Sequence, residues 1–109
     1  MAATPAFLQY VMEDLFGNNP AIAARSMFGG FGLYFEDKIF GIIAGDELYF
    51  KADKSNVHHF ISRGSQQFSY MKNGVEYKMS YWQVPAEIME NPHLLIKWAK
   101  ESSLIELKG

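Results

Sequence analysis

Residues 25–51 read RSMFGGFGLYFEDKIFGIIAGDELYFK, a series of short apolar and aromatic runs separated by turn residues. The runs are rich in the β-branched and aromatic residues that favour strands. Short turns separate them, at Gly29-Gly30, Glu36-Asp37-Lys38 and Gly45-Asp46-Glu47. Because connections of this length join antiparallel neighbours, we predict a meander of three or four strands over residues 22–51.

A helix is predicted before this meander and a shorter one after it. Thr4-Pro5 is a hydroxyl cap followed by proline, and apolar residues then recur at helical spacing up to Gly17, which predicts a helix over residues 5–16. A short second helix is expected within residues 53–64, with Asp53 or Ser55 as its cap and Gly64 as its end.

The C-terminal third combines a hairpin with helices. Residues 68–82, FSYMKNGVEYKMSYW, alternate around Asn73-Gly74, the pair that best supports a type I′ turn. A helical turn is expected from Pro85 to Met89, and Asn91-Pro92 begins a last helix. The order α, three or four β, α, two β, α predicts one α+β domain over residues 1–109, with helices covering an antiparallel sheet in two layers.

Composition limits the classes of function. The 109 residues include no cysteine, and the sequence has ten lysine and arginine residues and twelve acidic residues, which gives a net charge of −2. Direct DNA binding by the chain alone is therefore not expected, because DNA-binding domains usually carry a basic excess. The first residues lack a basic segment of the signal-peptide type, and no apolar run approaches the ~20 residues needed to cross a bilayer. We expect a cytoplasmic protein that does not interact with membranes.

The glycine-rich stretch does not predict a phosphate site. Gly30-x-Gly32 begins like a dinucleotide fingerprint, but Phe35 stands where the third glycine belongs, and a strand follows where a helix is needed. We interpret these glycines as structural. Gly29 and Gly30 would permit a positive φ at a turn or bulge, and Gly32 would let the backbone or a neighbouring ring approach closely. Gly74 belongs to the hairpin turn.

The sequence contains no recognised catalytic or metal-binding pattern. His58 and His59 are adjacent, so on a helix they point about 100° apart and cannot share a metal ion. No serine lies in a G-x-S-x-G turn, and the acidic residues fall at predicted turns. The sequence predicts no catalytic residue, no metal, no cofactor and no enzymatic activity.

Aromatic and basic residues of the predicted strands are the remaining candidates. They could pack the core, form a protein interface or stack on single-stranded nucleic acid, and all three interpretations stay open. Arg25 could pair with a carboxylate or contact a ligand. As contact residues on the exposed sheet and its rims we propose Arg25, Tyr34, Lys51, Tyr77, Tyr81 and Trp82.

Two parts of the sequence resemble the N-terminal domain of the TfoX/Sxy family of bacterial competence regulators. They are the R-x-M-F-G-G-x-G motif of residues 25–32 with the strands that follow it, and YKMSYWQVPAEIME, residues 77–90. The resemblance implies a secretion-chaperone-like α-β-α-β-α fold and a cytoplasmic regulatory role together with the cyclic-AMP receptor protein, a transcription activator. It implies no catalytic residue.

Family members usually continue into a second helical domain, whereas this sequence ends at Gly109. We therefore expect either a stand-alone form of the first domain or a piece of a longer chain. The predicted function is a regulatory module that contacts a transcription activator or a polymerase component. The alternative is a homodimer or a small-ligand-binding domain, in which residues 48–51, LYFK, would serve as a free edge strand.

Overall fold

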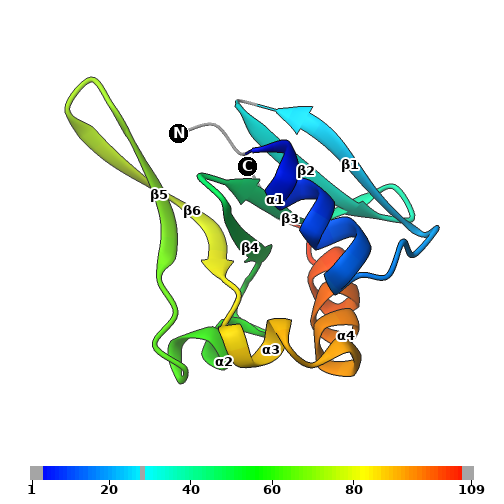
Figure 1. The fold of residues 1–109 in the computed structure, drawn as a ribbon. Coiled ribbons are helices and arrows are strands. Elements are labelled where there is room, and N and C mark those ends of the chain that lie inside the picture. The colour runs from blue at the N-terminus through cyan, green and yellow to red at the C-terminus, as the bar shows by residue number, and fades with distance from the viewer. Residues whose placement is uncertain (1–3, 28, 107–109) are drawn as a thin grey trace.

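The computed structural model describes residues 4–27 and 29–106, so Phe28 of the glycine-rich motif lies outside the described residues. It confirms the predicted α+β class, with helices and a six-stranded sheet (Figure 1). The elements are α1 (Pro5–Gln9), η1 (Tyr10–Leu15), β1 (Ile22–Met27), β2 (Gly30–Phe35), β3 (Lys38–Ala44), β4 (Glu47–Lys51), α2 (Val57–Ile61), β5 (Gln67–Lys72), β6 (Val75–Gln83), α3 (Ala86–Met89) and α4 (Pro92–Ser103).

All neighbouring strands of the sheet are antiparallel, in the order β1-β2-β3-β4-β6-β5. The hairpin β5–β6 returns to β4, where Lys51 is paired with Tyr81. The prediction that residues 48–51 form a free edge strand is therefore wrong, because β4 has a neighbour on each side. The edges of the sheet are β1 and β5.

The first predicted helix divides into two types of helix. Thr4 caps it as expected, accepting a hydrogen bond from the Phe7 N–H at 3.2 Å. From Tyr10 to Leu15, however, the helix has the wider π-type hydrogen bonding, which apolar periodicity does not distinguish from α. At the other end of the chain, Asn91 caps α4 as predicted, by accepting from the Leu94 N–H.

The predicted cap of the second helix is wrong. Asn56 holds the N-cap position of α2, and its side-chain oxygen accepts instead from the Asp53 N–H at 2.9 Å. Asp53 accepts from the N–H of Ser55 at 2.8 Å, which forms a local turn before the helix. The side chains of the two predicted cap residues therefore bond to each other, and neither caps the helix.

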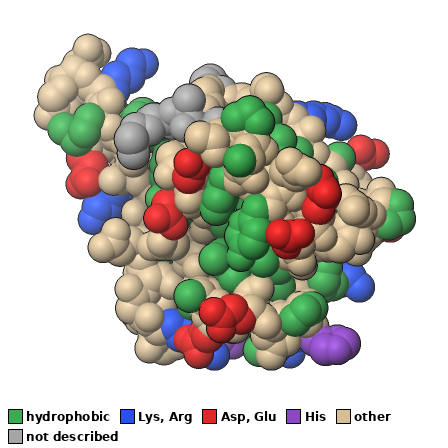
Figure 2. Space-filling view, viewed as in Figure 1, with side chains coloured by type: hydrophobic (Ala, Val, Ile, Leu, Met, Phe, Trp, Pro, Cys, Tyr) green, Lys and Arg blue, Asp and Glu red, His purple; other side chains and the backbone are tan. Residues whose placement is uncertain are grey.

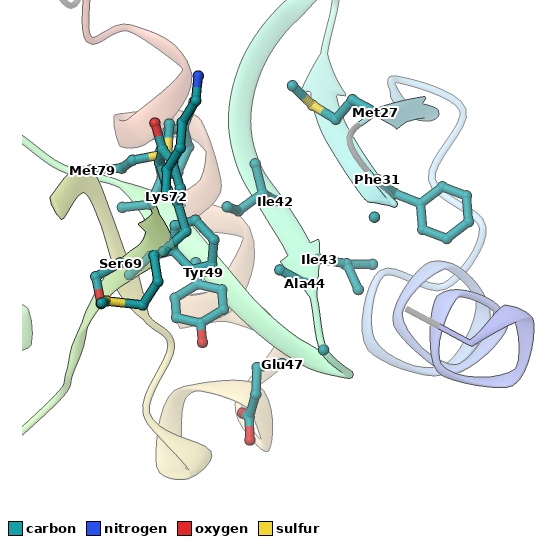
Figure 3. A pocket seen from close by; sticks show the side chains of 16 residues that line it. Met27, Phe31, Ile42, Ile43, Ala44, Glu47, Tyr49, Ser69, Lys72 and Met79 are labelled. Carbon is teal, nitrogen blue, oxygen red and sulfur yellow. The ribbon is translucent and has the colours of Figure 1, made fainter. Parts of the chain in front are cut away.

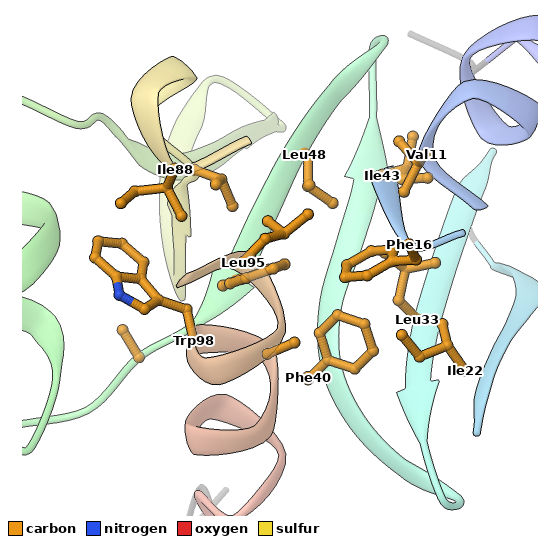
Figure 4. Close-up of a cluster of buried hydrophobic side chains, with 14 of the residues drawn as sticks. Val11, Phe16, Ile22, Leu33, Phe40, Ile43, Leu48, Ile88, Leu95 and Trp98 are labelled. Carbon is orange, nitrogen blue, oxygen red and sulfur yellow. The ribbon is translucent and has the colours of Figure 1, made fainter. Parts of the chain in front are cut away.

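The hydrophobic core lies between the helices and one face of the sheet (Figure 4). Phe40 is at its centre, with its ring edge-on to Phe16 from the N-terminal segment and to Phe50 from β4, at centroid distances of 5.7 and 5.4 Å. The register places Gly41 opposite Leu33 but Ile39 opposite Tyr34, so Phe40 is an extra residue in β3. This bulge directs the ring of Phe40 into the core.

The structural glycines have different roles. Gly29 and Gly74 have φ values of +79° and +77°, and Asn73 at +53° completes the predicted hairpin turn. Gly30 does not have a positive φ, so that part of the prediction is wrong. It lies in β2, where a Cβ would collide with the backbone carbonyl oxygen of Ile43. Gly32 permits a close approach, as predicted, because a Cβ there would lie 2.7 Å from the Met27 sulfur.

Candidate binding surface on the open face of the sheet

The face of the sheet that points away from the helices is called here the open face. Strand alternation divides the residues: Leu48 and Phe50 of β4 enter the core, so Tyr49 between them points to the open face. The register places Ile42 beside Tyr49 and Gly32 beside Ile42. The open face is therefore lined by residues that alternate with the core residues of the same strands.

A hollow of about 910 Å³ lies on this face, between the outer half of the hairpin and strands β1–β4 (Figure 3). It is mostly apolar, and the ring of Phe68 packs against Tyr49 at a centroid distance of 5.0 Å. Ile42 is almost fully buried at its base. The residues that line it include Ile42, Tyr49, Phe68, Tyr70, Met79 and Tyr81.

The outer half of the hairpin, residues 70–79, is called here the arm. It extends away from the body of the molecule in Figures 1 and 2, and every one of its residues is exposed. Large apolar side chains are nevertheless present, with Tyr77 45% and Val75 51% exposed, and Tyr70 is stacked on Tyr77 at 5.5 Å. The arm therefore presents aromatic and aliphatic surface that the described residues do not cover.

Alternation places this apolar surface on the side of the hollow. Alternate positions of β6 are occupied by Val75, Tyr77, Met79 and Tyr81, and the residues between them are polar. Because alternate residues share one side of a strand, the first three lie on the same side as Tyr81, which lines the hollow. At the edge of the hollow, the Ser69 hydroxyl donates to the Glu76 carboxylate at 2.9 Å. The open face and the arm thus form one continuous apolar surface.

Two charged residues line the hollow, and Figure 3 shows them at its opposite ends. Glu47 accepts a hydrogen bond from the Gln83 amide at 2.7 Å, and Lys72 belongs to the arm. Burial raises the pKa of Tyr49, and the Glu47 charge adds to the rise. Burial also raises the pKa of Tyr81, with a further contribution from Tyr34. Both phenols stay neutral near pH 7, so the wall between the two charges is uncharged.

Arg25 and Tyr34, two predicted contact residues, lie together on the open face near the β1 edge. The Arg25 guanidinium carbon lies 4.6 Å from the Tyr34 ring centroid, and its Nη2 is 3.6 Å from the Asp37 carboxylate. Both charged side chains are largely exposed, so this pair adds little to stability. Arg25 has the carboxylate partner considered from sequence, and its guanidinium is still accessible.

The other four predicted contact residues are in different environments. Tyr77 is on the arm, whereas Lys51 and Tyr81 are on the open face but only 5% and 7% exposed. Trp82 points to the other face, where it packs against the core. Burial lowers the pKa of Lys51, and the Glu106 charge partly opposes that effect. The interaction role of these residues stays a prediction, and Tyr77 offers a partner the most surface.

Sequence reasoning did not single out Ile42, Phe68 and Met79 as site residues, although they line the hollow. A signal was present for Met79, which continues the alternation of Tyr77 and Tyr81 in the predicted hairpin. No such signal exists for Ile42, because the apolar run around it does not show which residues face the helices.

Two further properties concern the described part of the chain. Within residues 4–27 and 29–106, no three histidine or acidic side chains are grouped so that they could hold a metal ion. No helix in the same ranges has the length and apolar character needed to cross a membrane.

Comparison with known proteins gives relatives over most of this chain. The family model of the TfoX N-terminal domain matches residues 14–104. Protein Sxy of Escherichia coli is 24% identical over 99 residues, which cover 91% of this chain and 47% of that protein. DNA transformation protein TfoX1 of Aliivibrio fischeri is 28% identical over 78 residues, covering 72% of this chain and 37% of that protein. The matched region is thus less than half of either relative.

Proposed function

The chain belongs to the TfoX N-terminal domain family, and on that premise we propose that it is a regulatory module that acts by binding another protein. One of the relatives that it resembles is named a DNA transformation protein. The proposed role is in transcriptional regulation in the cytoplasm, as an accessory to an activator of the cyclic-AMP receptor protein type or to a polymerase component. The partner is expected to bind on the open face.

The observation that carries this proposal is the apolar surface of the hollow and the arm that residues 4–27 and 29–106 leave uncovered. Tyr70, Tyr77 and Met79 are 39–45% exposed, although Tyr77 and Met79 alternate with polar residues along β6 as in a buried sheet face. Aromatic residues and methionine are enriched in the centres of protein interfaces, where charged residues are depleted. The hollow has this composition, with Glu47 and Lys72 as its charged residues among the described ones.

A protein partner suits this surface better than nucleic acid. Binding to phosphates needs accessible basic residues, and the chain has a net charge of −2. On the open face, Arg25 is held near Asp37 and Lys51 is buried. Lys72 stands at one end of an apolar hollow rather than in a basic groove.

One observation favours a second candidate, a small ligand. The volume of the hollow, about 910 Å³, lies within the range of about 300–1,000 Å³ that is common for ligand sites. Such sites usually converge several polar groups on the ligand, whereas this hollow is mostly apolar and open along the arm. If this hypothesis is right, the purified chain should bind a small molecule in the hollow in the absence of any protein partner.

The test is an affinity pull-down of the tagged chain from a lysate of its native cells, with and without nuclease. The proposal predicts a protein partner, a transcription activator or polymerase component, that is retained after nuclease treatment. Loss of all captured protein with nuclease would show that nucleic acid is the bridge and would contradict the proposal. Native mass spectrometry of the same sample shows whether a small molecule is retained in place of a protein.

A further inference from the structure

We propose that the hollow binds an amphipathic α-helix of the partner protein, with the N-terminus of that helix near Glu47 and its C-terminus near Lys72. The inference rests on the proposed function in one respect, that the partner is a protein. It adds the secondary structure of the bound segment, the place where it lies and its direction.

The floor of the hollow, away from the free edge of β5, favours a helix over an extended segment. Strands β3 and β4 form its floor, and each is hydrogen-bonded to a strand on both sides. They therefore have no free backbone groups to offer to an extended peptide. An extended segment on this apolar floor would leave its own N–H and C=O groups without partners, at a cost of about 1–3 kcal/mol each. A helix satisfies those groups internally.

The side chains of the hollow suit the apolar stripe of a helix. Figure 3 shows Met27 and Met79 on opposite sides, with Ile42 between them. Methionine side chains adapt to irregular surfaces and are common where amphipathic helices bind. Gly32 has no side chain of its own on the open face, and the Met27 sulfur lies close over it, where a Cβ would be 2.7 Å away.

The two charges give the helix a direction. The N-terminus of a helix carries a partial positive charge and its C-terminus a partial negative charge. Glu47 at one end of the hollow complements the N-terminus, and Lys72 at the other end complements the C-terminus. The opposite direction would place like charges together at both ends.

A second copy of this chain fits the hollow less well. Among the described helices, large apolar exposure is limited to separate residues such as Tyr10 of η1 and Ile61 of α2. The apolar residues of α4, including Leu95 and Trp98, are buried in the chain's own core. The described part of a second copy therefore offers no apolar helix stripe to place in the hollow.

The experiment is site-specific photo-crosslinking of the full chain in its native cells. The photoreactive residue p-benzoyl-phenylalanine replaces Ala44, which is paired with Glu47, in one protein and Tyr70, two residues from Lys72, in another. Ile61, exposed on α2, is the control position. Each variant is compared with the original chain by circular dichroism, and mass spectrometry then identifies the crosslinked peptides.

The proposal predicts that both hollow positions capture one segment whose apolar residues recur every three to four positions. Ala44 should crosslink to its N-terminal turn and Tyr70 to its C-terminal turn, and Ile61 should not capture it. A synthetic peptide of that segment should become helical on binding. The doubly reversed variant Glu47→Lys, Lys72→Glu should weaken its binding about threefold to tenfold.

Other outcomes would overturn the proposal. Crosslinks to this chain itself would identify a second copy, and a segment without helical periodicity, or with the reverse order of crosslinks, would contradict the bound helix. If the pull-down retains a partner but neither hollow position crosslinks to it, the hollow is not the site, although the proposed function stands. If the pull-down retains no protein, both fail together.

Discussion

The two faces of the sheet are built from alternate residues of the same strands, yet they are covered to very different degrees. On the helix face Phe40 and Phe50 have no exposed surface. On the open face Ile42 and Tyr81 are also buried, but Tyr77 and Met79 of the arm remain 45% and 39% exposed. Both faces have the alternating apolar pattern that normally accompanies burial. Alternation therefore identifies a face suited to burial without showing whether the chain itself or a partner covers it.

The largest predicted effect tests the helix face as the source of stability. Phe50→Ala removes a fully buried ring that packs on Phe40, so the free energy of unfolding should fall by about 3–5 kcal/mol. The matched change on the open face, Tyr77→Ala, should cost less than about 1 kcal/mol. Urea denaturation measures both, and equal losses would remove the distinction between the two faces.

A second prediction concerns the floor of the hollow. Gly30→Ala places a Cβ against the Ile43 carbonyl oxygen, which the paired backbone of β3 holds in place, so the cost should be about 1–3 kcal/mol. Gly74→Ala is the control, because its site has open space and a positive φ alone costs about 1–2 kcal/mol. The two variants lose stability for different reasons, a backbone collision at Gly30 and a positive φ at Gly74. Because asparagine tolerates a positive φ, Gly74→Asn should be more stable than Gly74→Ala, whereas Gly30→Asn should be no more stable than Gly30→Ala. Thermal unfolding of the four proteins checks this pattern.

A third prediction concerns the loss of folding stability caused by the buried positive charge of Lys51 on the open face. Burial holds the pKa of Lys51 below its ordinary value of 10.5, so between the two values the unfolded chain binds more protons and stability rises with pH. At pH 7 the charged lysine opposes folding, and Lys51→Met should stabilise the protein by up to about 1 kcal/mol. This advantage should shrink as the pH approaches 10.5. An advantage that stays constant up to that pH would contradict the buried cation.

The smallest predicted effect lies at the turn before α2, away from both faces. Hydrogen bonds from Ser55 lower the pKa of the Asp53 carboxyl. Such a group stabilises the fold above its unfolded pKa, and its contribution is lost as the pH falls through the lower folded value. Ser55→Ala should raise the pKa of Asp53 towards 3.8, its ordinary value, as an NMR titration of the carboxyl carbon would show. An unchanged titration would show that the Ser55 hydroxyl does not contribute.

Much of the fold could be predicted because its signals are local. The caps at Thr4 and Asn91 and the Asn73-Gly74 turn each act within a few residues, and all three are confirmed. The errors are about contacts between distant segments. The strand of residues 48–51 was expected at an edge because nothing in the sequence shows that the hairpin pairs with it.

The candidate site was less predictable for the same reason. Tyr77 and Arg25 were found from residue type alone, as an exposed aromatic and a cation in predicted strands. The hollow exists because the hairpin docks beside β4 through Tyr81 and Lys51, 30 positions apart in sequence on paired strands. That pairing also buries Lys51 and Tyr81. From their residue types alone, both were expected on the surface.

The most direct test of the account is one pair of measurements on the double variant Tyr77→Ser, Met79→Ser, with Lys78→Ser on the opposite side of the same strand as control. The account predicts that the double variant keeps its free energy of unfolding to within about 1 kcal/mol but no longer retains the protein partner in the pull-down, while the control keeps both. A double variant that still retains the partner would contradict the claim that the open face is the binding surface. A loss of stability as large as that of Phe50→Ala would contradict the division between a face that folds the chain and a face that binds.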